Sequence, residues 1–225
     1  MMGHKIILIA HIAFGFSALS LGIIPMILKK GGRAHIFWGN IYVYSMYGVS
    51  LSALGLFLLN PQKIFLQFLL CIAILSFYLT FTGVRAVQKK KNKSFNKSFD
   101  WIISVFVGLS GIASFGNGVY HWIVYSNINS VTILFMVFGL VIMFNSFNDL
   151  KSFRNPENNS KMQWFFNHLT RMLGAYIATF TAFCVVNNHF LPDLVAWILP
   201  GIIGGIFITF TVKHYKQKFQ GLNLV

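Results

Sequence analysis

Histidines are the residues of this sequence whose type and spacing could do chemistry, because four of the seven fall inside long apolar runs. His11 and His121 lie one to two turns from one end of their runs, and His35 and His168 lie near the opposite end of theirs. An ionisable side chain inside an apolar span is costly unless it faces a partner, a cavity or the interior of a bundle. The two layers of histidines therefore indicate a function.

The first hypothesis for these layers is bis-histidine ligation of b-type haem. Each haem needs two neutral imidazoles from facing helices, with small residues nearby to leave room for the macrocycle. Gly15 follows one turn after His11, and Gly39 follows one turn after His35. The expected ligands of one or two haems are the four histidines, paired as His35 with His168 and His11 with His121. The expected propionate or anion partners are two arginines, Arg33 and Arg171. Such a protein would pass electrons across or within the membrane to a redox partner.

The polar residues near His168 allow a second hypothesis, without redox chemistry. His168 and Arg171 are three residues apart and share a helix face. Together with His35, Arg33 and Asp149 they could bind a small anionic ligand or a lipid headgroup, or relay a proton. The protein would then be a transporter or carrier of a small anion, a lipid or a proton. Interfacial hydrogen bonding and an accessory membrane subunit without a ligand stay open as simpler interpretations. The sequence has no HExxH or HxxxH pair and only four carboxylates, which disfavours zinc enzymology and leaves enzymatic activity undecided.

The composition indicates that the bilayer is the solvent of this chain. Of the 225 residues, 56% are hydrophobic and 10% are charged, and the mean hydropathy is +0.67. A spanning helix takes about 20 apolar residues. The sequence therefore predicts one all-α membrane domain over residues 1–225, a polytopic seven-transmembrane-helix bundle with no separate soluble domain. The seven apolar runs cover residues 5–28, 35–59, 64–84, 101–125, 131–147, 164–186 and 194–212.

The charge distribution predicts the orientation of the bundle. Lys and Arg number 18 against four acids, and they fall in bursts between the apolar runs rather than along one face, which argues against nucleic-acid binding. Counted by alternate loops, 15 basic residues fall on one side and two, Lys5 and Lys63, on the other. Basic loops stay in the cytoplasm. We therefore expect the N-terminus outside, the C-terminus in the cytoplasm, and a location in the bacterial inner membrane.

Small residues at helical spacing predict where helices approach closely. One such series, Gly111, Ser114 and Gly118, lies in the fourth apolar run. Cys71 and Cys184 lie in apolar runs without a paired spacing, so we interpret them as small buried hydrophobes.

Three motifs carry a resemblance to a known family. They are His11-x3-Gly15, Gly32-Arg33-Ala34-His35-x3-Gly39, and His168-x2-Arg171-Met172-x-Gly174-Ala175-Tyr176. Over most of the chain, the sequence resembles an uncharacterised family of bacterial polytopic membrane proteins with a domain of unknown function. The resemblance implies a helical inner-membrane protein and supplies no activity, and His121 falls outside it. The layered histidines are also similar in layout to diheme ferric-reductase-like membrane cytochromes.

Overall fold

The protein is all-α. The computed structural model describes residues 2–91, 97–125, 129–155 and 161–221, and these form seven helices that are each long and apolar enough to cross a membrane. The helices are α1 (Met2–Ile27), α2 (Arg33–Leu59), α3 (Ile64–Lys91), α4 (Ser98–Tyr125), α5 (Ser130–Arg154), α6 (Gln163–Val186) and α7 (Asp193–Gln220). The prediction of a multi-pass helical membrane protein is confirmed.

Several helices continue beyond the apolar runs that predicted them. The third run ends at residue 84 and α3 at Lys91; the fifth ends at 147 and α5 at Arg154; the seventh ends at 212 and α7 at Gln220. The segments added to α3 and α7 are rich in Lys, Arg or Gln, which have high helix propensity, and the segment added to α5 ends in Arg154. Basic side chains near a helix C-terminus are also favoured by the helix dipole. Hydropathy therefore predicts only the apolar part of each of these helices, whereas the helical hydrogen bonds continue beyond it.

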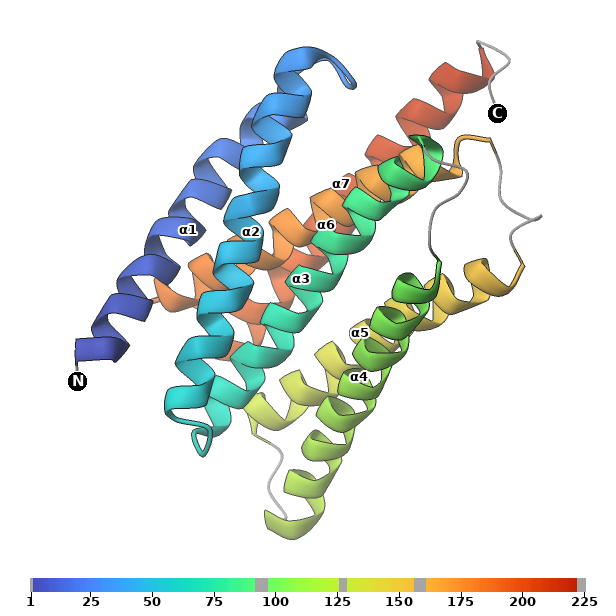
Figure 1. Ribbon diagram of the computed structural model, residues 1–225. Helices are drawn as coiled ribbons and strands as arrows, with labels where there is room; N and C mark the ends of the chain where they lie inside the picture. Colours follow the sequence, from blue (N-terminus) through green and yellow to red (C-terminus); the bar gives the residue numbers. More distant parts are fainter. Residues whose placement is uncertain (1, 92–96, 126–128, 156–160, 222–225) are drawn as a thin grey trace.

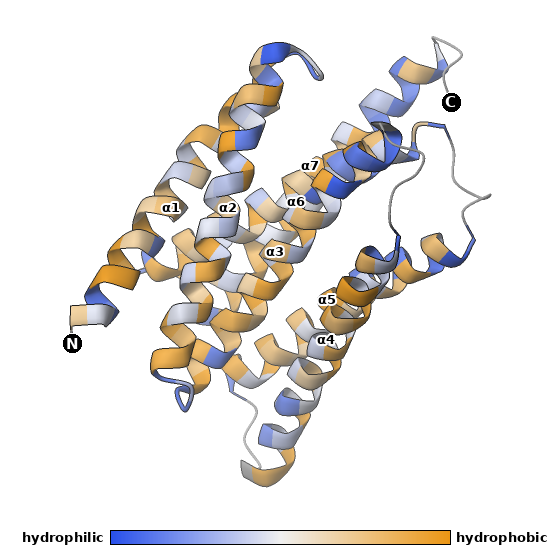
Figure 2. Cartoon of the chain, viewed as in Figure 1, coloured by the Kyte–Doolittle hydropathy of each residue, from blue (hydrophilic) through white to orange (hydrophobic). Residues whose placement is uncertain are grey.

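Two helices, α3 and α6, form the centre of the bundle (Figure 1). The α1–α2 pair packs on one side of them, the α4–α5 pair on the other, and α7 lies against α6. The C-terminal ends of α1, α3, α5 and α7 all lie at one end of the bundle, where hydrophilic residues gather in Figure 2. We call this the basic end.

Glycine allows the close contact between α4 and α5. A Cβ added to Gly139 of α5 would lie 2.7 Å from the backbone nitrogen of Phe115 and 2.9 Å from the carbonyl oxygen of Gly111. The hydroxyl of Ser114 donates to the carbonyl oxygen of Phe135, 3.0 Å away. The small-residue series predicted in the fourth run therefore lies at a helix contact.

We expect the substitution Gly139→Ala to destabilise the protein, because the obstacles to the new methyl group are backbone atoms that cannot turn away. Overpacking of this kind costs about 1–3 kcal/mol. Thermal unfolding in detergent should show a clearly lowered midpoint. Gly116→Ala is the matched control, since a Cβ at Gly116 of α4 meets no atom within 4 Å. Equal midpoints for the two variants would contradict the proposed close contact.

Candidate functional site

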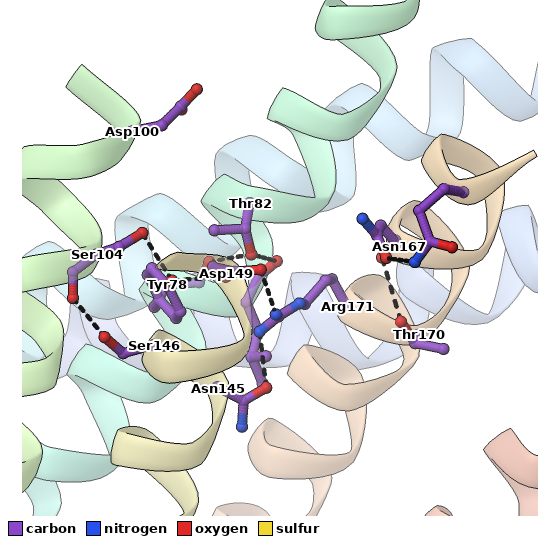
Figure 3. Close-up of polar contacts among 12 residues, drawn as sticks. Tyr78, Thr82, Asp100, Ser104, Asn145, Ser146, Asp149, Asn167, Thr170 and Arg171 are labelled. Carbon is purple, nitrogen blue, oxygen red and sulfur yellow. Dashed lines mark hydrogen bonds and ion pairs between the residues drawn. The ribbon is translucent and has the colours of Figure 1, made fainter. Parts of the chain in front are cut away.

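Arg171 of α6 points toward α5 at the basic end of the bundle (Figure 3). Its Nη1 donates to Asn145 Oδ1 and its Nη2 to Asp149 Oδ1, both at 2.7 Å. The side chains of Arg171 and Asp149 are only 12% and 14% exposed. A buried ion pair of this kind is stable only when hydrogen bonds satisfy the remaining polar atoms.

Tyr78 of α3 supplies the second partner of Asp149 (Figure 3). Its hydroxyl donates to Asp149 Oδ2 at 2.5 Å and lies 2.9 Å from Ser104 Oγ of α4. Because the Tyr78 hydroxyl donates its proton to the Asp149 carboxylate, the hydroxyl of Ser104 is the donor in its bond to Tyr78. The hydroxyl of Ser146 donates to the Ser104 carbonyl oxygen at 2.7 Å. One network thus joins α3, α4, α5 and α6.

A second ion cluster lies closer to the basic end. Arg85 Nε lies 2.6 Å from Asp100 Oδ1, and Lys89 Nζ lies 3.1 Å from Asp100 Oδ2. Arg85 and Lys89 are four residues apart on α3, so they share a helix face. The ammonium of Lys89 also lies 4.3 Å from the centre of the Phe153 ring, within the range of a cation–π contact. The Asp100 side chain, in the first turn of α4, is 4% exposed.

Between these clusters lies a cavity of about 290 Å³, enclosed by the basic-end segments of α3 to α6. It extends from the buried Asp100 to the exposed Lys97 and Lys161, so it opens to the surface. Two helices, α4 and α6, begin at the cavity, and the positive ends of their dipoles add to its potential. Among the described residues, six basic side chains and two acidic ones line it: Arg85, Lys89, Lys90, Lys97, Lys161 and Arg171 with Asp100 and Asp149. We call this space the basic cavity.

His35 and His168 lie together on the opposite side of the α3–α6 pair. Their ring centroids are 6.4 Å apart with an interplanar angle of 75°. His35 Nδ1 donates to the Pro25 carbonyl oxygen at 3.0 Å, and His168 Nδ1 donates to the Gly83 carbonyl oxygen at 2.9 Å. These bonds fix the Nδ1–H tautomer of each ring and leave Nε2 as an acceptor or metal ligand. The structure thus brings together His35 and His168, the two histidines that the sequence placed in one layer.

The C-terminal end of α1 explains part of the arrangement of His35. The last carbonyl groups of a helix have no partner within the helix. Lys30 Nζ donates to the carbonyl oxygens of Pro25 and Met26, at 2.9 and 2.5 Å, and His35 bonds to the first of them. Partial burial lowers the pKa of the Lys30 amine. His35 and Lys30 therefore cap α1, whatever else the histidine does.

His11 and His121 are not brought together. His11 Nδ1 lies 2.9 Å from Ser52 Oγ, whose proton is donated to the Gly48 carbonyl oxygen, so His11 is the donor to Ser52. In the described chain α1 packs against α2 and α6, whereas α4, which carries His121, packs against α3 and α5. The geometry supports the inner histidine pair and gives the outer pair no shared site.

The two predicted arginines differ in position. Arg171 lies in the wall of the basic cavity, whereas Arg33 is the exposed first residue of α2 and does not line it. The sequence interpretation missed Arg85, Lys89 and Asp100 as site residues and counted them only as loop charges or as scarce carboxylates. A signal was present, because Arg85 and Lys89 are spaced for one helix face directly after an apolar run.

Comparisons of the chain with protein-family models, curated proteins and solved structures gave no match. The functional argument therefore rests on the geometry of the basic cavity and of the histidine pair.

Proposed function

We propose that this protein binds a phosphate-bearing anion in the basic cavity and acts as a membrane carrier for it. The observation that supports the proposal is a surface-opening space of about 290 Å³ lined by six basic and two acidic side chains. Arginine and lysine are the side chains that most often bind phosphate. Helix N-termini, of which two begin at this cavity, also favour anions.

The acids of the cavity hold its cations in place without neutralising them. Asp149 bonds to Arg171, and Asp100 is paired with Arg85 and Lys89. Lys90 is positioned differently, with its ammonium 3.9 Å from the centre of the Trp164 ring. Cations that are held by acids or aromatic rings do not need to be ordered when the anion arrives, which lowers the entropic cost of binding.

The position of the cavity suits a carrier. The α4–α5 pair forms one wall and the α3–α6 pair the other, and the Arg171–Asp149 ion pair joins the two walls. An anion that binds Arg171 competes with Asp149 for the same guanidinium. Transporters commonly work by the movement of one group of helices against another around a central site. In this proposal, occupancy of the cavity weakens the link between the two walls.

We further propose that the basic end faces the cytoplasm of a bacterial cell, with the N-terminus outside, because basic loops are retained there. Single cysteines introduced by Lys63→Cys and Lys213→Cys, in a background with Cys71→Ser and Cys184→Ser, test this orientation. A membrane-impermeant thiol reagent added to intact cells should label the first site at once and the second only after permeabilisation. The reverse pattern would overturn the orientation.

Titration of purified wild-type protein with inorganic phosphate should give saturable heat that weakens as salt is added. Lys97→Gln combined with Lys161→Gln removes two exposed cations of the cavity rim. Two such charges contribute about 0.2–1 kcal/mol each, so affinity should fall roughly two- to thirtyfold. Lys29→Gln combined with Lys213→Gln removes the same charge from the basic end outside the cavity and should change little. Absence of binding to the wild type, or equal losses in both variants, would refute the anion site.

Haem binding by His35 and His168 is a second candidate function, favoured by the 6.4 Å separation of the two ring centroids and by two Nδ1–H bonds to carbonyl oxygens. Histidines that bind metals use this type of bond to orient the ring. Bound haem would supply one-electron chemistry within the membrane. The chain itself would hold the two imidazoles in a fixed tautomer.

Protein purified from haem-replete cells should then show a reduced-minus-oxidised Soret and alpha band, and His168→Ala should abolish both. His11→Ala is the matched control, and it should leave the spectrum unchanged because His11 bonds to Ser52 on the outer half of the bundle. A colourless wild-type preparation would rule out this candidate and leave the histidines as capping and packing residues.

A further inference from the structure

Asp100 carries a buried oxygen whose hydrogen-bonding capacity is not used. Its Oδ1 is bonded to Arg85 Nε at 2.6 Å. Its Oδ2 is inaccessible to solvent and accepts no hydrogen bond from the described residues, although Lys89 Nζ lies 3.1 Å away, outside hydrogen-bond geometry. A buried acceptor without a donor is costly, and such atoms are rare in folded proteins.

The unused acceptor belongs to the wall of the basic cavity. Figure 3 shows Asp100 on α4, separate from the network of Tyr78, Asp149 and Arg171, of which Asp149 and Arg171 also line the cavity. Oδ2 is covered in this structure, and Lys89 Nζ lies 3.1 Å from it, so a molecule in the cavity reaches this oxygen when the Lys89 side chain, which is 34% exposed, moves aside. The molecule then meets both an excess of cations and one carboxylate oxygen that accepts no hydrogen bond from the described residues. This combination is more selective than a basic patch, which would accept any anion.

The charges around Asp100 decide which kind of donor fits. Arg85 and Lys89 already place two positive charges beside this single carboxylate. A ligand ammonium group would add a third positive charge and would be repelled. A hydroxyl group donates a hydrogen bond without adding charge, and hydrogen bonds to an ionised acceptor are among the stronger ones in proteins.

We propose that the ligand is a phosphate ester with a free hydroxyl group near the phosphate, and that Asp100 is the residue that selects the hydroxyl. The basic side chains of the cavity hold the phosphate, and Asp100 Oδ2 accepts the hydroxyl proton in a hydrogen bond. This inference rests on the proposed anion site and names its substrate class. A free polyol phosphate and the glycerol headgroup of a lipid share this chemistry.

Matched pairs of probes test the hydroxyl and separate the two sources. For free ligands the pair is glycerol 3-phosphate and propyl phosphate, titrated into detergent-purified wild-type protein. For lipids the pair is phosphatidylglycerol and phosphatidylethanol, each mixed into neutral phosphatidylcholine vesicles that contain the protein. In at least one pair, the hydroxylated member should bind about tenfold more tightly or better, as expected for a hydrogen bond to a charged acceptor. The pair that shows the preference identifies the source.

Asp100→Leu removes the acceptor at similar volume and should abolish the preference for the hydroxylated probe. Because Asp100 also holds Arg85 and Lys89, the affinity ratio within each pair of probes, and not the absolute affinity, is the measure. Asp193→Leu is the control, because Asp193 begins α7 at the other end of the bundle. Asp100→Asn, which keeps a neutral acceptor, should retain a smaller preference and serves if the leucine variant does not fold. Wild-type protein that binds both members of each pair equally would overturn this inference and leave the anion site intact. Wild-type protein that binds neither these probes nor inorganic phosphate would overturn the anion site itself.

Discussion

The ion pair between Arg171 and Asp149 is the constraint on which the basic half of the bundle depends. A guanidinium among apolar helices cannot shed its charge, so it must find acceptors at its own depth. Asp149 and Asn145 provide them from one face of α5, and Tyr78 completes the coordination of the carboxylate from α3. Removing one partner of such a pair leaves an uncompensated charge and costs about 3–5 kcal/mol. These bonds therefore fix the relative depth and rotation of α3, α5 and α6.

The same electrostatic requirement shapes the cavity. The basic side chains at the ends of α3 to α6 repel one another, and this repulsion would push the helix ends apart if no acidic side chains bound them. Asp100 and Asp149 are two of only four carboxylates in the chain, and both line this space beside the cations they bind. With six cations and two acids among its described residues, this group of side chains keeps its shape and has an excess of positive charge. The stability of this end and its affinity for anions thus have a common cause.

Sequence reasoning predicted the spans, because hydropathy and the alternation of basic loops determine how often the chain crosses the membrane. It also predicted the depth of each histidine, which depends only on position along a helix. It could not predict neighbours in the membrane plane, since these depend on helix rotation and packing. His35 and His168 lie close together because α2 and α6 both pack against α3, where His35 bonds to Pro25 at the end of α1 and His168 bonds to Gly83 of α3. His11 and His121 lie on helices that do not contact each other within the described chain. Asp100 was missed for the same reason, because its role appears only when α4 lies beside α3.

One turn of α6 carries a residue of each polar site: His168 of the histidine pair and Arg171 of the basic cavity. His168 bonds to the Gly83 carbonyl oxygen of α3, and a Cβ at Gly83 would lie 3.2 Å from the Cβ of Arg171. The close approach of α3 and α6 at this glycine therefore sets the position of the histidine on one side and of the arginine on the other. A shift of α6 along α3 cannot alter the basic cavity without also altering the bond of His168 to Gly83. The absence of a side chain at Gly83 thus lets one helix contact set the positions of His168 and Arg171, although neither histidine of the pair lines the cavity.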